Sequence, residues 1–214
     1  MVQLEELNIA SKFEILPNGI DIKPFYKHQS NREIKKIIFC SRLQKRKGID
    51  KFIALAEYFE LSSSEYIFEI YGPDGGELQS SLETIKTKNL KNIRYRGSLS
   101  PEEVSGVLKE CDLLVLPSKN EPFPMIVLES LSVGTPALVM PSCGLANELR
   151  QYAPELVAVE ESLEGLISGI EALKNRTRLD KEVGELMRFC ENTFGISKVA
   201  DRLEGIYQKV AKHA

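Results

Sequence analysis

The stretch KIIFCSRLQKRKGIDKFIALAEYFEL, residues 36–61, carries the pattern that decides the fold. Its first six residues, KIIFCS, contain a run of four apolar residues and predict a buried strand. Residues 48–61 then place apolar side chains along one face of a helix. These side chains are Ile49, Phe52, Ile53, Leu55, Ala56 and Phe59. A buried strand that leads through a short basic loop into an amphipathic helix is typical of the first half of a βαβ unit.

The alternation of strand and helix continues along the chain. Further strands are predicted at residues 66–71, 92–95, 112–116, 136–140 and 156–159, and helices at 78–88, 101–110, 124–133 and across most of 162–211. Ser100 and Glu103 give one of these helices the signature of a capping box. Because the strands are apolar on both faces and helices join them, we expect a sheet covered on both sides. The predicted fold class is α/β, a doubly wound parallel sheet of Rossmann-like type over about residues 15–159, with C-terminal helices.

Length and composition limit the class of protein. The 214 residues, 43% of them hydrophobic and 28% charged, are enough to bury a core without disulfides or metal. The formal net charge of -3 gives no general electrostatic support for nucleic-acid binding, so no nucleic-acid partner is expected. No apolar run is long enough to span a membrane, and the acidic start MVQLEELNIASKF lacks a signal-peptide core. A cytoplasmic protein is therefore expected.

The metal-binding and nucleophilic residue types form no recognisable motif. The cysteines have no CxxC pair and suit a reducing compartment; they are Cys40, Cys111, Cys143 and Cys190. His28 and His213 stand in no triad or metal-ligand spacing, and no phosphate-binding GxxxxGK[ST] motif is present. We predict no metal site, and we expect Cys40 to be a small core residue.

The candidate binding residues follow the strands. In an open parallel sheet, ligands bind beyond the carboxyl ends of the strands, which selects the loops at residues 42–48, 72–76, 96–100 and 118–124. The first loop carries four cations between a strand and a helix N-terminus, an arrangement suited to a diphosphate. Those cations are Arg42, Lys45, Arg46 and Lys47. A solvated basic loop is the alternative interpretation.

Two acidic residues stand out in the fourth loop and the helix after it. Glu121 and Glu129 are about two helical turns apart, and carboxylates accept hydrogen bonds from paired vicinal hydroxyls. They would suit the two ends of a sugar-containing ligand. From spacing alone, two surface glutamates near a helix start are the simpler interpretation. Gly72, at a strand end, would let a ligand approach the backbone, whereas Gly75 and Gly76 suit a plain turn.

Six segments of the chain resemble, in order, the C-terminal half of retaining GT-B glycosyltransferases of the glycosyl transferases group 1 family. They are ILPNGID at 15–21, FCSRLQKRKGIDKFI at 39–53, FEIYGPDG at 68–75, IRYRGSLSPEEVSGVLKECDLLVLPS at 93–118, EPFPMIVLESLSVGTPAL at 121–138 and FGISKVADRLEGIYQKV at 194–210. The order makes the match specific. Pro122, Pro124 and Ser41 depart from it, since many members have glycine at those positions.

The resemblance implies a role for each loop. Arg42 and Lys47 would bind the donor diphosphate and stabilise it as it leaves, while Glu121 would contact the donor sugar and Glu129 the ribose hydroxyls. Glu121, Arg42 and Lys47 are the implied catalytic residues. The other implied donor-binding residues are Gly72, Arg96, Gly97, Ser98, Leu99, Phe123, Pro124, Met125 and Ile126. The expected reaction is hexosyl transfer with retention from a UDP- or GDP-sugar to a glycan or lipid-linked acceptor, as in cell-surface polysaccharide synthesis. No cofactor or metal is implied, because the cations would take the metal's part.

The resemblance also implies a domain arrangement. Residues 1–195 would be the nucleotide-sugar-binding domain and residues 196–214 the C-terminal crossover helix, with the N-terminal acceptor domain absent. The chain alone would then be inactive, and the full enzyme would work in the cytoplasm, peripheral to the membrane. The apolar face of the last helix would be open to self-association; its members are Val199, Leu203, Ile206, Tyr207 and Val210. The alternative is a nonenzymatic nucleotide-sugar-binding or partner-binding module with the same fold.

Overall fold

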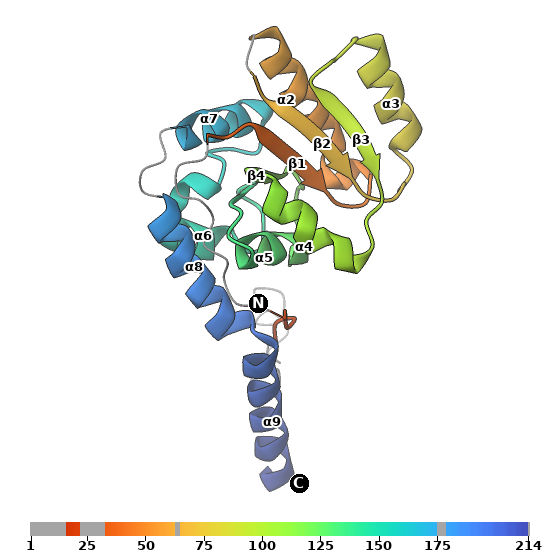
Figure 1. Cartoon of the computed structure of the whole chain (residues 1–214). Coiled ribbons are helices and arrows are strands. Elements are labelled where there is room, and N and C mark those ends of the chain that lie inside the picture. The colour runs from red at the N-terminus through yellow and green to blue at the C-terminus, as the bar shows by residue number, and fades with distance from the viewer. Residues whose placement is uncertain (1–15, 22–32, 63–64, 175–178, 214) are drawn as a thin grey trace. The chain divides into compact units, whose positions relative to one another are not determined.

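The computed structural model describes residues 16–21, 33–62, 65–174 and 179–213. The N-terminal stretch expected to lack a signal peptide, residues 1–13, lies outside the described residues, as do His28 and the side chain of His213. Figure 1 shows the arrangement of the elements within the sheet-containing part of the chain.

Five parallel strands form one sheet among the described residues. They are β1 (Lys36–Cys40), β2 (Ile67–Tyr71), β3 (Ile93–Gly97), β4 (Leu113–Leu116) and β5 (Ala137–Val139). Their order in the sheet is β3-β2-β1-β4-β5, so the direction of winding reverses between β1 and β4. Ligands bind at such a reversal in open α/β sheets, because the loops after the two central strands diverge there. The predicted doubly wound parallel sheet is confirmed.

One predicted strand is wrong. Pro154–Leu156 forms a short 3-10 helix, η3, where a strand was expected to begin. Only Val157 in this segment pairs with the sheet, through a single parallel bridge to Val139. The proline fixes its own φ and offers no N–H to a ladder, which accounts for the helical turn at the start of this apolar segment.

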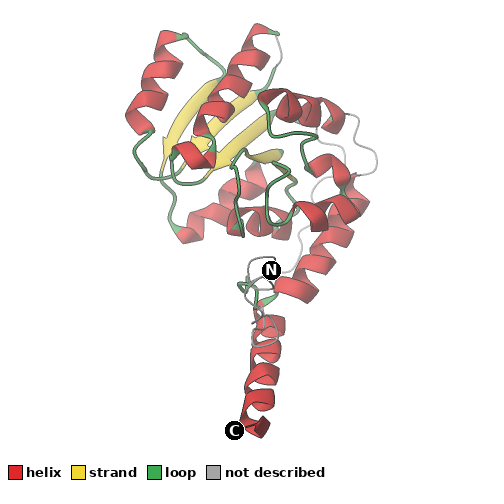
Figure 2. Cartoon of the chain, turned by 180° about the vertical axis from the view of Figure 1, so that it is seen from behind, coloured by secondary structure: helices red, strands yellow, loops and turns green. Residues whose placement is uncertain are grey.

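Helices cover both faces of the sheet, as Figures 1 and 2 show. One layer contains α2 (Ile49–Leu61), α3 (Leu78–Thr87) and α7 (Leu163–Leu173), and the other contains α4 (Pro101–Glu110) and α5 (Met125–Ser132). The short helix α6 (Ala146–Tyr152) follows β5. The predicted capping box is present at the start of α4, where the Ser100 N–H donates to the Glu103 carboxylate at 2.7 Å.

One part of the core lies between α2 and the sheet. All six apolar residues predicted for the inner face of the first helix are buried in α2. Phe52 of α2 packs against Phe39 of β1 and Phe68 of β2, with ring centroids 5.6 and 5.5 Å away. Full burial of one such side chain contributes roughly 1.5–3 kcal/mol. This packing fixes the start of α2, and with it the basic loop that precedes the helix.

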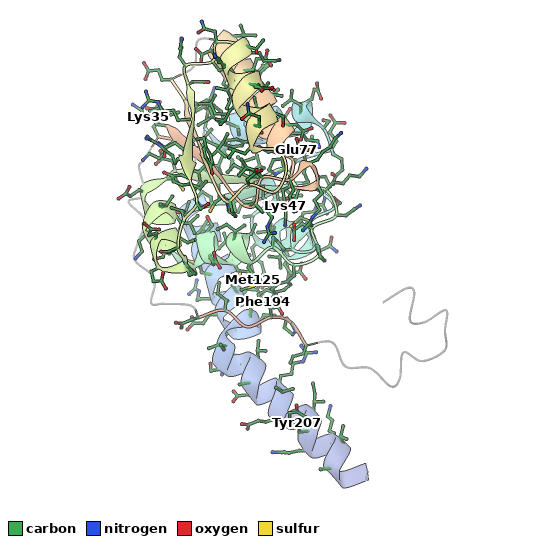
Figure 3. The ribbon with its side chains drawn as sticks, turned by 90° about the vertical axis from the view of Figure 1, so that its right-hand side faces the viewer. Lys35, Lys47, Glu77, Met125, Phe194 and Tyr207 are labelled. Atoms are coloured by element: carbon green, nitrogen blue, oxygen red, sulfur yellow. The ribbon has the colours of Figure 1, made fainter. Side chains whose placement is uncertain are left out.

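Contacts divide the chain into two compact units. One unit is residues 23–189, which contains the sheet, and the other combines residues 1–22 with residues 190–214. In the second unit, the Ile20 N–H donates to the Phe194 carbonyl at 2.8 Å, and the Ile196 N–H donates to the Ile20 carbonyl at 3.0 Å. The helix α8 (Leu179–Phe194) ends there and α9 (Ile196–His213) follows. Tyr207 of α9, labelled in Figure 3, is 66% exposed.

All four cysteines are buried, as expected for Cys40. Burial raises the pKa of the Cys40 thiol to about 12 and that of Cys143 to about 11. Thiols held in this way are poor nucleophiles, because the thiolate is the reactive form. No helix among the described residues is both long enough and apolar enough to cross a membrane.

Candidate functional site

The basic loop after β1 is held against the end of β4. Lys45–Lys47 forms a short 3-10 helix, η2, and Gly48 then adopts a left-handed conformation with φ 76° before α2 begins. A Cβ atom at Gly48 would lie 2.3 Å from the carbonyl oxygen of Pro117. Glycine is therefore required both by its φ angle and by the close approach of the two backbones.

Lys47 and Glu121 meet at this edge of the sheet. Lys47 donates a hydrogen bond from Nζ to Oε2 of Glu121, and the two side chains are only 15% and 10% exposed. Arg46 is more distant, with Nη1 at 4.0 Å from the same oxygen and a side chain that is 63% exposed. The Ser118 hydroxyl also donates to the Lys47 carbonyl at 3.3 Å. The structure thus brings the first and fourth predicted loops together, and Lys47, labelled in Figure 3, is the sheltered cation.

The second predicted loop packs against the first through its glycines. Gly72 has φ 141°, and a Cβ atom there would lie 1.9 Å from the Ser41 carbonyl oxygen. The Gly75 N–H donates to the Leu43 carbonyl at 3.1 Å, and a Cβ on Gly75 would lie 2.8 Å from Cγ of Arg42. The exposed Arg42 therefore projects from a loop that the glycine turn supports.

The third predicted loop is tied to the second. The Gly72 N–H donates to the Gly97 carbonyl, and the Tyr95 hydroxyl donates to the Gly72 carbonyl, both at 2.9 Å. Gly97 has φ 96°, which favours glycine. Ser98 is exposed and Leu99 is half-buried. These contacts place the loops after β2 and β3 side by side.

The Arg96 side chain forms an ion pair with Glu69 of β2, a residue that the sequence analysis did not select. Arg96 donates from Nε to Oε1 of Glu69 at 2.7 Å, and the Tyr71 hydroxyl donates to Oε2 at 2.9 Å. Burial on its own raises the pKa of Glu69, but the bonds from Arg96 and Tyr71 and the Lys36 charge outweigh it, and the pKa is lowered. The signal was a lone acid inside the apolar strand YIFEIY. Arg96 therefore meets a protein carboxylate, and the backbone of residues 97–99 remains for a ligand.

Glu129 differs from Glu121 in having no hydrogen-bond partner for its carboxylate in the described parts of the chain. It lies in the second turn of α5, where burial raises the pKa of its carboxyl group. Its charge also contributes to the raised pKa of Cys40, which places it near the carboxyl end of β1. Within the described residues, no side chain or backbone N–H bonds to the Glu129 carboxylate. A half-buried acceptor of this kind favours a ligand that brings its own hydrogen-bond donors.

The start of α5 lies directly after the Glu121 loop. Pro124 is its N-cap and accepts from the Val127 N–H at 3.0 Å. The N–H groups of Met125 and Ile126 have no backbone acceptor among the described residues, as is usual in a first helical turn. Phe123 and Pro124 connect this turn to Glu121 in the chain, and Met125, the first residue of α5, is labelled in Figure 3.

The loop after β5 is a part of the site that the sequence analysis missed. The Asn120 N–H donates to the Ser142 hydroxyl at 2.9 Å, and the Gly144 N–H donates to the Glu121 carbonyl at 2.7 Å. A Cβ atom at Gly144 would lie 1.8 Å from the Pro122 carbonyl oxygen. The signal was available, because the strand-end rule that selected four loops applies equally to residues 141–145. No group of His, Cys, Asp and Glu side chains in the described parts of the chain is placed to hold a metal ion.

The model of the family described as glycosyl transferases group 1 matches residues 23–188. An uncharacterized glycosyltransferase of Methanocaldococcus jannaschii is 24% identical over 210 residues, which cover 98% of this chain and 57% of that protein. The UDP-Gal:alpha-D-GlcNAc-diphosphoundecaprenol alpha-1,3-galactosyltransferase of Escherichia coli is 25% identical over 219 residues, covering 92% of this chain and 54% of that enzyme. The chain therefore spans about half the length of these relatives.

Among solved structures, HepE from Anabaena in complex with UDP and glucose superposes with a TM-score of 0.76 at 15% identity. The superposition covers 91% of this chain and 56% of that one. At this identity the likeness bears on the fold alone, and it agrees with the α/β fold expected from the sequence.

Proposed function

The chain belongs to the glycosyl transferases group 1 family, and from this premise we propose that it is the donor-binding half of a GT-B glycosyltransferase. It binds a nucleotide-diphosphate sugar, and in the full enzyme the sugar is transferred, with retention, to a glycan or lipid-linked acceptor. The observation that carries the proposal is the pairing of Lys47 with Glu121 at the carboxyl edge of the sheet, together with the half-buried Glu129, whose carboxylate bonds to no described residue.

The donor diphosphate is assigned to the basic loop. Lys47 is sheltered, Arg42 is exposed in the same loop, and the N-terminus of α2 follows directly. Backbone N–H groups at a helix start, together with two cations, attract the negative charge of a diphosphate. The same groups stabilise the charge that grows on the diphosphate as the bond to the sugar breaks, which is how they act catalytically. Lys47 then faces the phosphates on one side and Glu121 on the other.

The two acids take different ends of the donor. Glu129 is a half-buried acceptor, and the vicinal hydroxyls of a ribose supply the donors that it lacks. Glu121 has one carboxylate oxygen on Lys47 and the other available to hydroxyls of the sugar. The remaining positions serve as the walls of the donor site. The backbone of Gly72, Gly97, Ser98 and Leu99 faces the base, and Phe123, Pro124, Met125 and Ile126 face the sugar and phosphates.

The donor is assigned to the UDP- or GDP-sugars. The name of the Escherichia coli relative gives UDP-Gal as its donor, and the Anabaena neighbour was crystallised with UDP and glucose. Transfer requires an acceptor as well as a donor, and the proposal assigns the donor side of the reaction to this chain. In this proposal residues 1–195 form the donor domain, residues 196–214 the crossover helix, and the full enzyme works in the cytoplasm at a membrane surface. Self-association through the exposed side chains of α9 stays a prediction.

Calorimetric titration of the chain with UDP, GDP and ADP tests the proposal. One nucleotide should bind and stabilise the fold by roughly 1–3 kcal/mol at saturating concentration. Lys47→Ala should weaken binding at least tenfold, because a sheltered cation on a phosphate is lost. The matched control is Lys45→Ala, an exposed lysine two residues earlier, which should change affinity far less. Absence of binding by all three nucleotides would contradict the proposal.

A further inference from the structure

The loop after β5 reaches the Glu121 segment at two points. The Ser142 hydroxyl accepts from the Asn120 N–H at 2.9 Å, on the residue just before Glu121. The Gly144 N–H donates to the carbonyl of Glu121 itself at 2.7 Å. The first bond holds the backbone before the Glu121 Cα atom, and the second holds the backbone after it. Together they fix the position of the Glu121 backbone.

The same loop is anchored from its other side. The Ser142 N–H donates to Oε1 of Glu161, a residue of the segment before α7, at 2.5 Å. Ser142 therefore links Glu161 to Asn120 through its own N–H and hydroxyl. Among the described residues, Glu161 forms no hydrogen bond with the Glu121 segment itself. Ser142 is therefore the hydrogen-bonded link between Glu161 and the residue before Glu121.

The backbone at the point of contact is held in an uncommon conformation. Asn120 has φ 52°, one of two non-glycine residues with positive φ in the described parts of the chain. Asparagine tolerates this region better than most residues, but the conformation persists only where surrounding contacts determine it. A contact that holds this residue is the hydrogen bond from its N–H to the Ser142 hydroxyl.

We propose that Ser142, backed by Glu161, is a positioning residue that sets the Glu121 carboxylate for the sugar part of the donor. This inference rests on the proposed function and adds two residues that neither spacing nor family motif assigns. Lys47 fixes the charged end of the Glu121 side chain, and Ser142 fixes the backbone from which that side chain extends. Loss of Ser142 therefore loosens the sugar end of the site, while the diphosphate loop after β1 keeps its own contacts.

Ser142→Ala should weaken binding of the sugar part of the donor and not of the diphosphate. The measurement is therefore a ratio of two dissociation constants. For each protein, the dissociation constant for a nucleoside diphosphate is divided by that for the nucleotide sugar with the same base. The probes are UDP with UDP-glucose, GDP with GDP-mannose and ADP with ADP-glucose, and the pair that binds most tightly to the unchanged chain is used. Ser142→Ala should lower this ratio about fivefold, the worth of one neutral hydrogen bond, and leave the affinity for the free diphosphate unchanged.

Two matched sets separate positioning from a general loss of structure. Ser142→Thr keeps the hydroxyl and should restore most of the ratio. Glu161→Ala should lower the ratio as Ser142→Ala does, whereas Glu161→Gln, whose amide oxygen still accepts an N–H, should preserve it. Ser80→Ala on α3 removes another serine–glutamate hydrogen bond, outside the site, and should change nothing.

The outcomes distinguish this inference from the proposed function. If no nucleotide binds the unchanged chain, the proposed function fails. If free and sugar-linked nucleotides bind equally well, the sugar role of Glu121 fails, and the inference with it. If the sugar strengthens binding and neither Ser142→Ala nor Glu161→Ala alters the ratio, the inference alone is overturned.

Discussion

Lys47 donates a hydrogen bond to the carboxylate of Glu121, which lies 74 residues further along the chain. The pair joins the loop after β1 to the loop after β4, the two strands between which the sheet reverses its winding. Both side chains are mostly sheltered from water, at 15% and 10% exposure. Loss of one partner therefore leaves a poorly solvated charge, which gives the pair a structural role besides its proposed role in donor binding.

A double-mutant cycle should reveal this coupling. The single changes Lys47→Met and Glu121→Gln should each destabilise the chain, and the double change should destabilise it by less than their sum. A coupling free energy of about 1–2 kcal/mol is expected from urea unfolding at neutral pH. The control cycle is Lys88 with Glu57, a more exposed pair at 2.6 Å, for which at most about 1 kcal/mol is expected. A Lys47–Glu121 coupling no larger than that of the control would contradict the structural role.

Gly48→Ala should destabilise the protein by about 3 kcal/mol or more, because two separate penalties apply. The residue has φ 76°, and its new Cβ would lie 2.3 Å from the backbone oxygen of Pro117. Gly106→Ala is the matched control, since that glycine lies inside α4 with nothing within 4 Å of the added atom. It should stabilise the chain by roughly 0.5–1 kcal/mol. Thermal unfolding of both variants checks the difference, and equal effects would count against the close packing of the two loops.

The sequence predicted best those features that depend on local periodicity. The buried face of α2 and the capping box at Ser100 follow from spacing within one helix, and both are present. The strand-end rule correctly anticipated that the loop after β1 and the segment of Glu121 would meet, because the order of β1 and β4 in a doubly wound sheet brings them together. It could not say which of four cations would meet Glu121. That choice depends on the 3-10 turn, which shelters Lys47 and leaves Arg46 in solvent.

Features that depend on pairing between distant strands escaped prediction. The bond of Arg96 to Glu69 requires the register of β3 against β2, which no local pattern encodes. The contact of Ser142 with Asn120 likewise arises from the neighbouring positions of β4 and β5. The strand expected at 156–159 was wrong because Leu156 belongs to the helical turn that starts at Pro154, and the segment forms a single bridge, at Val157. In the first two cases a tertiary contact decided the outcome, and in the third the local turn at Pro154 did.

Because Glu69 is buried and has a lowered pKa, the free energy of unfolding should depend on pH in the acidic range. Its pKa is lowered from the ordinary 4.5 in the folded state, so its contribution is complete above that pH and is lost as the pH falls through the lowered pKa. Glu69→Gln should therefore destabilise the chain at pH 7 by about 1 kcal/mol, and the difference from the unchanged chain should shrink below pH 4.5. Urea unfolding at several pH values measures this. The exposed Glu65→Gln is the control, and a difference that stays constant with pH for Glu69→Gln would contradict the assignment.

Glu129→Gln should change stability and binding in opposite directions. Burial raises the pKa of this carboxyl group and no described partner offsets it, so ionisation of Glu129 weakens the fold as the pH rises above 4.5 through the raised pKa. The neutral amide should therefore stabilise the chain at pH 7 by on the order of 1 kcal/mol, and this gain should vanish in acid. The exposed Glu110→Gln serves as the control.

The same change should weaken nucleotide binding about tenfold, because ribose hydroxyls lose a charged acceptor. The cleanest measurement compares a ribonucleotide with its 2′-deoxy form. The unchanged chain should prefer the ribonucleotide, and Glu129→Gln should lose most of that preference while its affinity for the deoxy form changes little. A variant that is less stable at pH 7, or that still discriminates fully between the two sugars, would show that Glu129 does not hold the ribose. A variant that is more stable but binds the ribonucleotide more weakly would show that the Glu129 carboxylate serves a ligand at the expense of stability.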